Sequence, residues 1–312
     1  MAKKKNGARR GAPCGEGILS FMSGCASRLR EAGREGTSRT FVSTMRSLSR
    51  FLGGRDVPLR ELNPEVIKNY ETYLLGCGVT RNTVSFYMRT LRTACRQSSW
   101  EGLPKDMQAS FGGVYTGFGK TRKRSAGLSG IRAVRRLDLS GDPKLAFARD
   151  MFVLSFYLRG MPFVDLAHLR KSDLMEGRLR YERQKTRQTL SIEWTRQMQE
   201  IVRRYAPLTM GSPYLLPILR LDGSDERKQY DNALRRVNRH LRQVGRLAGM
   251  AIPLSTYVAR HTWASVAHAL QVPVQVISEG LGHDCELTTQ IYIASLDDTV
   301  IDRANHRIIS AV

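Results

Sequence analysis

The amino-acid sequence predicts a mainly α-helical protein with one small antiparallel β-sheet, divided into two domains. Its 312 residues are enough for two domains that each bury a core. Apolar residues recur at helical spacing through most of the chain. Only residues 175–194 show the pattern of two strands joined by a turn.

The chain begins with positive charge and no apolar pattern. Residues 1–16 are rich in Lys, Arg, Gly and Pro, so we expect a flexible basic arm there. The segment 17–102 then predicts a bundle of four helices. The first runs from about Gly17 to Glu35, and the second follows Thr37, a possible N-terminal cap. The apolar face of this second helix holds Phe41, Met45, Leu48 and Leu52.

The third and fourth helices have clear start signals. Asn63 followed by Pro64 is a capping residue before a proline at the first helical position. The fourth helix follows Thr80. Its polar face carries four arginines, Arg81, Arg89, Arg92 and Arg96. The alternatives for this face are contact with a phosphate backbone and simple solvation.

Between the two expected domains lies a segment, 103–128, with neither a helical nor a strand pattern, and we expect a linker. Four basic residues gather near its end, namely Lys120, Arg122, Lys123 and Arg124. A flexible basic linker can follow a phosphate backbone as two domains close around a duplex. A solvated run of charge is again the alternative.

The second expected domain, residues 129–312, is mainly helical. Helical periodicity runs through residues 145–158. Strands are expected at 179–183 and 189–194, with Lys185 in the turn between them. A long helix follows Asp225, with an apolar face that includes Leu241 and an outer face of Arg235, Arg236, Arg239 and Arg242.

The composition favours a nucleic-acid partner. Lys and Arg total 50 against 28 acidic residues, for a net charge of +22. Such a field attracts a polyanion, and DNA or RNA is the first expectation. A membrane surface is less favoured, because the charge is spread along the whole chain instead of along one amphipathic helix. The five cysteines are scattered, which predicts a reducing cytoplasm, and no apolar run or signal sequence predicts a membrane or export.

The motifs that carry chemistry lie in the last fifty or so residues. Arg260-His261 precedes Leu281-Gly282-His283, and Tyr292 follows nine positions after that histidine. A tyrosine hydroxyl is an oxygen nucleophile, and cationic groups can hold the charge that builds on phosphorus when it attacks a phosphodiester. Apolar neighbours around Arg260 predict that its side chain is buried.

These residues and their spacings resemble the tyrosine recombinases of the phage-integrase family. The resemblance implies a SAM-like core-binding domain followed by a catalytic domain. It also implies that Tyr292 attacks the scissile phosphate to give a 3′-phosphotyrosyl link. Arg260 would bind the phosphate, and His283 would hydrogen-bond it or shuttle a proton. Lys185 would protonate the departing 5′-oxygen.

Two positions depart from the family pattern. A histidine is usual three residues before the arginine, and here the residue is Tyr257, for which a positioning donor and a packing residue are both open. The family's first arginine is aligned with Pro162. Arg159 lies about one helical turn earlier and is our candidate substitute.

The resemblance also predicts partners and cofactors. The chemistry conserves phosphodiester energy in the tyrosyl link, so we expect no ATP, no obligatory metal and no other cofactor. Strand exchange in the family needs four protomers on two duplexes of DNA. The short segment before the helical bundle favours a compact invertase, resolvase or transposon recombinase over an integrase with distant arm sites. A non-catalytic DNA-binding relative and a type IB topoisomerase are the alternatives.

Overall fold

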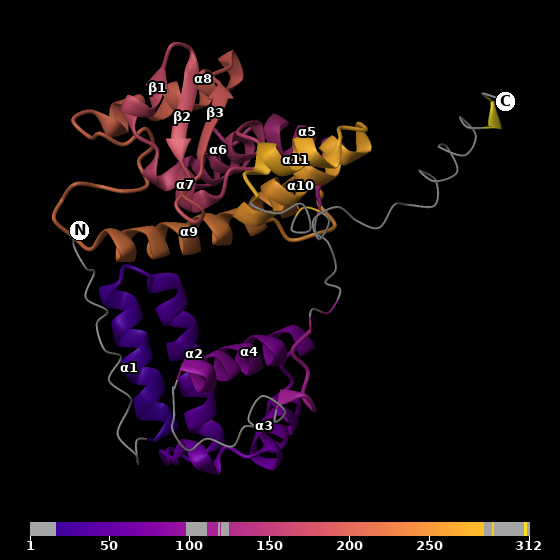
Figure 1. The fold of residues 1–312 in the computed structure, drawn as a ribbon. Coiled ribbons are helices and arrows are strands. Elements are labelled where there is room, and N and C mark those ends of the chain that lie inside the picture. The colour runs from indigo at the N-terminus through magenta and orange to yellow at the C-terminus, as the bar shows by residue number, and fades with distance from the viewer. Residues whose placement is uncertain are drawn as a thin grey trace, which may run out of the picture. The chain divides into compact units, whose positions relative to one another are not determined.

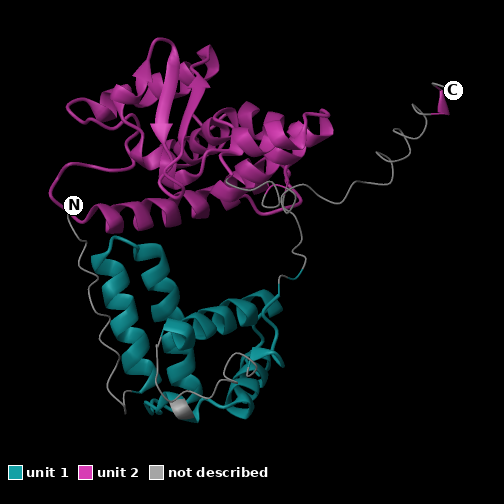
Figure 2. Cartoon of the chain, viewed as in Figure 1, with its two compact units in different colours: residues 1–121 teal, residues 122–312 magenta. Residues whose placement is uncertain are grey.

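The computed structural model describes residues 17–97, 111–117, 119, 125–283, 289 and 309–310. The chain divides into two compact units, residues 1–121 and 122–312 (Figure 1, Figure 2). The expected basic arm lies outside the described residues. So does the basic cluster of the expected linker, Lys120, Arg122, Lys123 and Arg124.

Unit 1 is a bundle of helices around an apolar core. Its elements are α1 (Ile18–Glu31), α2 (Glu35–Phe51), the 3-10 turn η1 (Leu59–Glu61), α3 (Pro64–Gly76) and α4 (Arg81–Gln97). Every one of these four α-helices contributes buried apolar side chains, among them Met22, Leu48, Ile67 and Leu91. The four-helix prediction for this segment is confirmed.

The helix starts in unit 1 follow the sequence signals unevenly. The Asn63 side chain accepts a hydrogen bond from the Val66 amide at 2.9 Å, so the predicted cap of α3 is confirmed. The predicted first helix was too long. Gly33 adopts φ 70° and ends α1 early, and α2 already begins at Glu35, so that Thr37 lies inside the helix instead of capping it.

Unit 2 is a helical domain with one small sheet. In chain order it contains α5 (Gly127–Arg136), α6 (Pro143–Tyr157), α7 (Phe163–His168), η4 (Lys171–Asp173), β1 (Leu174–Met175), β2 (Arg178–Glu182), β3 (Thr189–Glu193), α8 (Arg196–Tyr205), η5 (Ala206–Thr209), α9 (Glu226–Leu247), α10 (Thr256–Ala269) and α11 (Val274–Leu281). α6 is the central helix, because α5, α7, α8, α9 and α10 all pack against it. Its buried residues therefore lie on all sides, unlike those of an amphipathic surface helix.

The predicted hairpin is confirmed, and it carries one further short strand. The strands run antiparallel in the order β1-β2-β3, with Leu179 opposite Ile192. Leu179, Tyr181 and Ile192 are buried on the face that packs against the domain core. The hairpin thus has one inward face. Residues 183–188 form the turn that joins β2 to β3.

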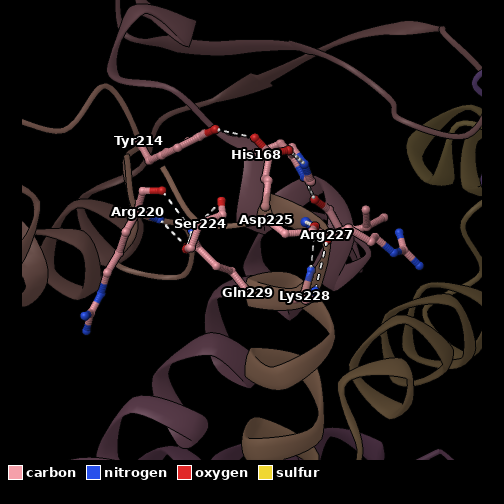
Figure 3. Close-up of polar contacts among 10 residues, drawn as sticks. His168, Tyr214, Arg220, Ser224, Asp225, Arg227, Lys228 and Gln229 are labelled. Carbon is pink, nitrogen blue, oxygen red and sulfur yellow. Dashed lines mark hydrogen bonds and ion pairs between the residues drawn. The ribbon is translucent and has the colours of Figure 1, made fainter. Parts of the chain in front are cut away.

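The long helix α9 is fixed at its start by a polar network (Figure 3). Asp225 caps the helix by accepting from the amides of Arg227 and Lys228 at 2.8 and 3.1 Å. The carboxylate of the next residue, Glu226, contacts His168 Nε2 and the Tyr214 hydroxyl, each at 3.0 Å. The start of α9 is therefore held by α7 and by the loop that precedes α9.

Among the described residues, no helix is long and apolar enough to cross a membrane.

Candidate active site

Arg260 lies near the middle of α10, and its side chain is only 3% exposed, as its apolar neighbours predict. Nη1 donates to the Gly160 carbonyl at 3.0 Å, and Nη2 donates to the Leu281 carbonyl at 2.7 Å. Nη2 also lies 2.8 Å from His283 Nε2. Burial, and next the charge of Arg183, lower the pKa of Arg260 to about 10, so the group stays cationic at neutral pH. A buried, charged hydrogen-bond donor is thus fixed by three segments of the domain.

His283 follows directly after α11. Gly282 ends that helix in the left-handed conformation, with φ 63°, and turns the chain so that His283 faces Arg260. A guanidinium can only donate, so His283 Nε2 must be the acceptor. The proton is then on Nδ1, which lies 2.7 Å from the hydroxyl of buried Thr289.

The ionisation of His283 follows from the same surroundings. Burial lowers its pKa to about 4, and the charges of Arg260, Arg183 and Lys185 act in the same direction. The imidazole is therefore neutral near pH 7. A neutral His283 can accept a proton or hydrogen-bond an oxygen, and an added anion would raise its pKa again.

Arg183 is a site residue that the sequence analysis missed. It follows β2 and is 5% exposed. Nη1 donates a hydrogen bond to the Gly282 carbonyl, and Nε lies 3.6 Å from Asp165 Oδ2 on α7. One signal could have found it. Position 183 has the same parity along the strand as the inward-facing Leu179 and Tyr181.

Asp165, whose carboxylate lies beside Arg183, is also buried, at 3% exposure. Its Oδ1 accepts from the Gln184 amide at 2.9 Å. Burial raises the pKa of Asp165, although the Gln184 amide, Arg183 and Arg260 each act to lower it. Asp165 therefore ties the turn of the hairpin to α7 and places one acidic group beside the two arginines.

Lys185 lies at the exposed turn between β2 and β3, where it was expected. Its charge is close enough to His283 to lower the pKa of that imidazole. Tyr257 is half-exposed on α10, and its ring meets the His261 ring edge-on at a centroid distance of 4.8 Å. Burial of part of the side chain raises the Tyr257 pKa, so its hydroxyl is a donor near neutral pH.

Arg159 and Pro162 lie in the connection between α6 and α7. Arg159 is half-buried with φ 57°, a left-handed conformation that is unusual outside glycine. Its charge acts on the Tyr181 phenol and lowers the pKa of that group, against the larger effect of burial. Pro162 immediately precedes α7. Arg260, His283 and the unexpected Arg183 thus lie in one cluster, within electrostatic reach of Lys185. Arg159 directly precedes Gly160, which contacts Arg260.

Two groups of predicted residues remain. Tyr292, the expected nucleophile, lies outside the described residues. On α4, Arg81 and Arg96 are exposed, whereas Arg89 and Arg92 are half-buried, so the expected polar face is partly covered. The cause is the tight packing of α4, whose Met88 and Leu91 are fully buried.

The chemistry that this arrangement supports is binding and stabilisation of an anionic oxygen centre. Two buried guanidinium groups and one mobile ammonium supply positive charge, and a neutral imidazole supplies a proton acceptor. Removal from water strengthens each interaction with a bound anion.

Comparisons with known proteins agree with the fold. Residues 18–110 match the family model described as the phage integrase SAM-like domain. A curated relative, tyrosine recombinase XerC of Thermodesulfovibrio yellowstonii, is 24% identical over 265 residues, which cover 82% of this chain and 85% of the relative.

Solved structures share the fold at lower identity. A lambda integrase tetramer bound to a Holliday junction matches with a TM-score of 0.67 and 16% identity, over 90% of this chain and 79% of that one. The Tn1549 transposon integrase in complex with a circular intermediate DNA matches with a TM-score of 0.64 and 15% identity, over 94% of this chain and 99% of that one.

Proposed function

We infer that this chain is a tyrosine recombinase, a site-specific recombinase that cuts and rejoins DNA strands. The observation that carries this proposal is the 2.8 Å contact between Arg260 and His283. It joins the two most diagnostic motifs of the sequence in one buried cationic pocket. The net charge of +22 suits the DNA partner.

The proposed mechanism is an in-line displacement at phosphorus. The Tyr292 oxygen attacks the scissile phosphate, a new phosphorus–oxygen bond forms, and the bond to the 5′-oxygen breaks. Arg260 binds the non-bridging oxygens and stabilises the charge of the transition state. His283, neutral near pH 7, accepts the phenol proton, and Lys185 donates a proton to the departing 5′-oxygen. Religation is the reverse of these steps with a different 5′-hydroxyl.

Two further residues have proposed roles beside this pocket. Tyr257 is a positioning donor toward the phosphate, since its phenol carries its proton at neutral pH. Arg159 is a peripheral cation whose charge acts on the phenol of Tyr181. Tyr257 stands where the family usually supplies a histidine, and Arg159 lies three residues before Pro162, where it usually supplies an arginine.

DNA contacts outside the catalytic pocket are assigned to unit 1 and to the connecting segment. The proposed phosphate ligands are the α4 and linker residues Arg81, Arg89, Arg92, Arg96, Lys120, Arg122, Lys123 and Arg124. We further propose a homotetramer on paired DNA sites, because recombination joins two duplexes and each contributes two half-sites. We also propose a cytoplasmic location, which the scattered cysteines and the proposed DNA substrate support.

The test is capture of a covalent adduct. Wild-type protein is incubated with a pool of nicked duplexes of random sequence, and strands that stay attached in SDS but are released by protease are sequenced. A nick beside the scissile phosphate lets the short leaving strand diffuse away, which traps the adduct. We expect a defined site with wild type and no adduct with Tyr292→Phe.

Other outcomes would support other functions. An adduct without sequence preference, together with relaxation of supercoiled DNA, would indicate a type IB topoisomerase. Sequence-specific binding without any adduct would indicate a DNA-binding relative that has lost catalysis. The departures at Tyr257 and Pro162 give this last outcome its physical basis.

A further inference from the structure

We propose that Arg183 is a catalytic residue that supplies the second guanidinium to the scissile phosphate. This inference rests on the proposed recombinase function and adds a residue to it. It answers a specific deficit, because Pro162 stands where the family resemblance implies an arginine. A proline offers no positive charge and no N–H donor to an anion.

The position of Arg183 parallels that of Arg260. Arg260 donates to the carbonyl of Leu281, and Arg183 donates to the carbonyl of the next residue, Gly282. The two guanidinium groups therefore lie side by side at the carboxyl end of α11, directly before His283. Gly282 makes room for this approach, because a Cβ there would lie 2.8 Å from Arg183 Cδ.

Electrostatic effects among the charged groups also indicate that Arg183 lies close to Arg260 and His283. The positive charge of Arg183 lowers the pKa of both Arg260 and His283, after the larger effect of burial. Arg159, the candidate from the sequence, acts on the phenol of Tyr181. Arg183 is thus an arginine within electrostatic reach of both Arg260 and His283.

The hydrogen bonds of Arg183 are incomplete. Its Nε and Asp165 Oδ2 are 3.6 Å apart, too far for a hydrogen bond, and among the described residues neither buried atom has another partner. Buried polar atoms in native proteins are nearly always paired. A guanidinium held in this way retains donor capacity for an additional acceptor.

The balance of charge indicates what that acceptor is. Among the residues that the structure describes here, three cations, Arg183, Arg260 and Lys185, stand against the carboxylate of Asp165, while His283 is neutral. A phosphodiester brings one negative charge, and its transition state carries more. An oxyanion bound between the two arginines would compensate the excess positive charge and satisfy the Arg183 donors.

The test uses substrates that differ by one charge. Duplexes carrying the site recovered in the adduct assay are made with either a phosphate or a neutral methylphosphonate at the scissile position. Adduct formation is timed for wild type, Arg183→Ala, Arg183→Lys and Arg159→Ala. Arg187→Ala is the matched control, because Arg187 lies in the same hairpin but pairs with Glu182 at the surface.

We expect Arg183→Ala to slow adduct formation on phosphate by about 100-fold or more. On the methylphosphonate, the same variant should come within about tenfold of wild type, because the charge that Arg183 neutralises is absent. Arg183→Lys keeps a cation but lacks the planar guanidinium. Its rate of adduct formation on phosphate should lie between those of wild type and Arg183→Ala. Arg187→Ala should match wild type on both substrates.

Several results would overturn the inference. Equal losses on both substrates for Arg183→Ala would mean that Arg183 only supports α11. Should that variant unfold in a thermal melt, Arg183→Lys decides instead, and equal losses on both substrates again contradict the inference. Selective recovery of Arg159→Ala on the methylphosphonate would assign the role to Arg159. If wild type forms no adduct on any DNA, the proposed function itself has failed.

Discussion

Gly160 and Arg260 lie in such close contact that a Cβ at position 160 would be only 2.7 Å from the Arg260 Cα. The Gly160 carbonyl also accepts a hydrogen bond from Arg260 Nη1 at 3.0 Å. Gly160 has φ 68°, which side chains disfavour. Gly160 therefore has three roles. It adopts the positive φ of the turn, it leaves space for the close approach of α10, and its carbonyl holds the Arg260 guanidinium.

The first prediction is that Gly160→Ala destabilises unit 2 and slows DNA cleavage. The methyl group meets a main-chain atom, the Arg260 Cα, which cannot move aside as the end of a flexible side chain can. It also strains a positive φ. We expect a loss of about 2–4 kcal/mol in the free energy of unfolding, measured with denaturant. Gly141→Ala is the control, because a Cβ at that position would meet nothing within 4 Å. A loss as large in the control would refute the packing argument.

The second prediction concerns the fork of Arg260. A lysine at this position cannot donate to Gly160, Leu281 and a phosphate together. Arg260→Lys should slow adduct formation by about 100-fold or more. It should also lower the free energy of unfolding by about 1–3 kcal/mol, because a buried carbonyl loses its donor. Arg246→Lys, on the exposed side of α9, should change neither quantity. Normal cleavage by Arg260→Lys would remove Arg260 from the proposed mechanism.

The third prediction is a pH dependence of stability. The folded chain holds the pKa of His283 near 4, below the ordinary value of 6.5, so this group favours the folded state fully above pH 6.5. As the pH falls from about 6.5 to 4, His283 becomes protonated in the unfolded chain but stays neutral in the folded chain. The free energy of unfolding therefore falls over this range. Below about pH 4, His283 is protonated in both the folded and the unfolded chain, so it makes no further contribution to the pH dependence.

The measurement is the free energy of unfolding against pH for wild type and His283→Gln. The variant should lose stability less steeply between pH 6.5 and 4. Burial also lowers the pKa of His240, but that effect is present in both proteins and cancels in the comparison. Parallel curves would mean that His283 is not held neutral in the folded pocket.

The sequence predicted best those features that depend on neighbours along the chain. The cap predicted at Asn63 is a local hydrogen bond, and it is confirmed, as is the long helix predicted after Asp225. The burial of Arg260 followed from apolar residues on its own helix. The hairpin with Lys185 at its turn followed from alternation in two short runs. Each of these signals lies within one element.

The features that the sequence did not reveal depend on contacts between distant segments. Arg183 reads as one more charge in a basic hairpin, and only its contacts with Asp165 and Gly282 distinguish it. Gly282 is 99 residues away in the chain, so no local pattern could pair the two. The half-burial of Arg89 and Arg92 likewise depends on how α4 packs within unit 1.

The last prediction tests Lys185 as the proton donor to the leaving group. An alkoxide leaves poorly without a proton, whereas a thiolate leaves readily because a thiol has a pKa of about 8.5. Lys185→Ala should therefore slow adduct formation on the normal substrate by about 100-fold or more. On a substrate with sulfur in place of the 5′-oxygen, the same variant should cleave at nearly the wild-type rate. Arg187→Ala, at the same turn, should show no such difference. If sulfur fails to restore cleavage, Lys185 acts by holding the phosphate and not by transferring a proton.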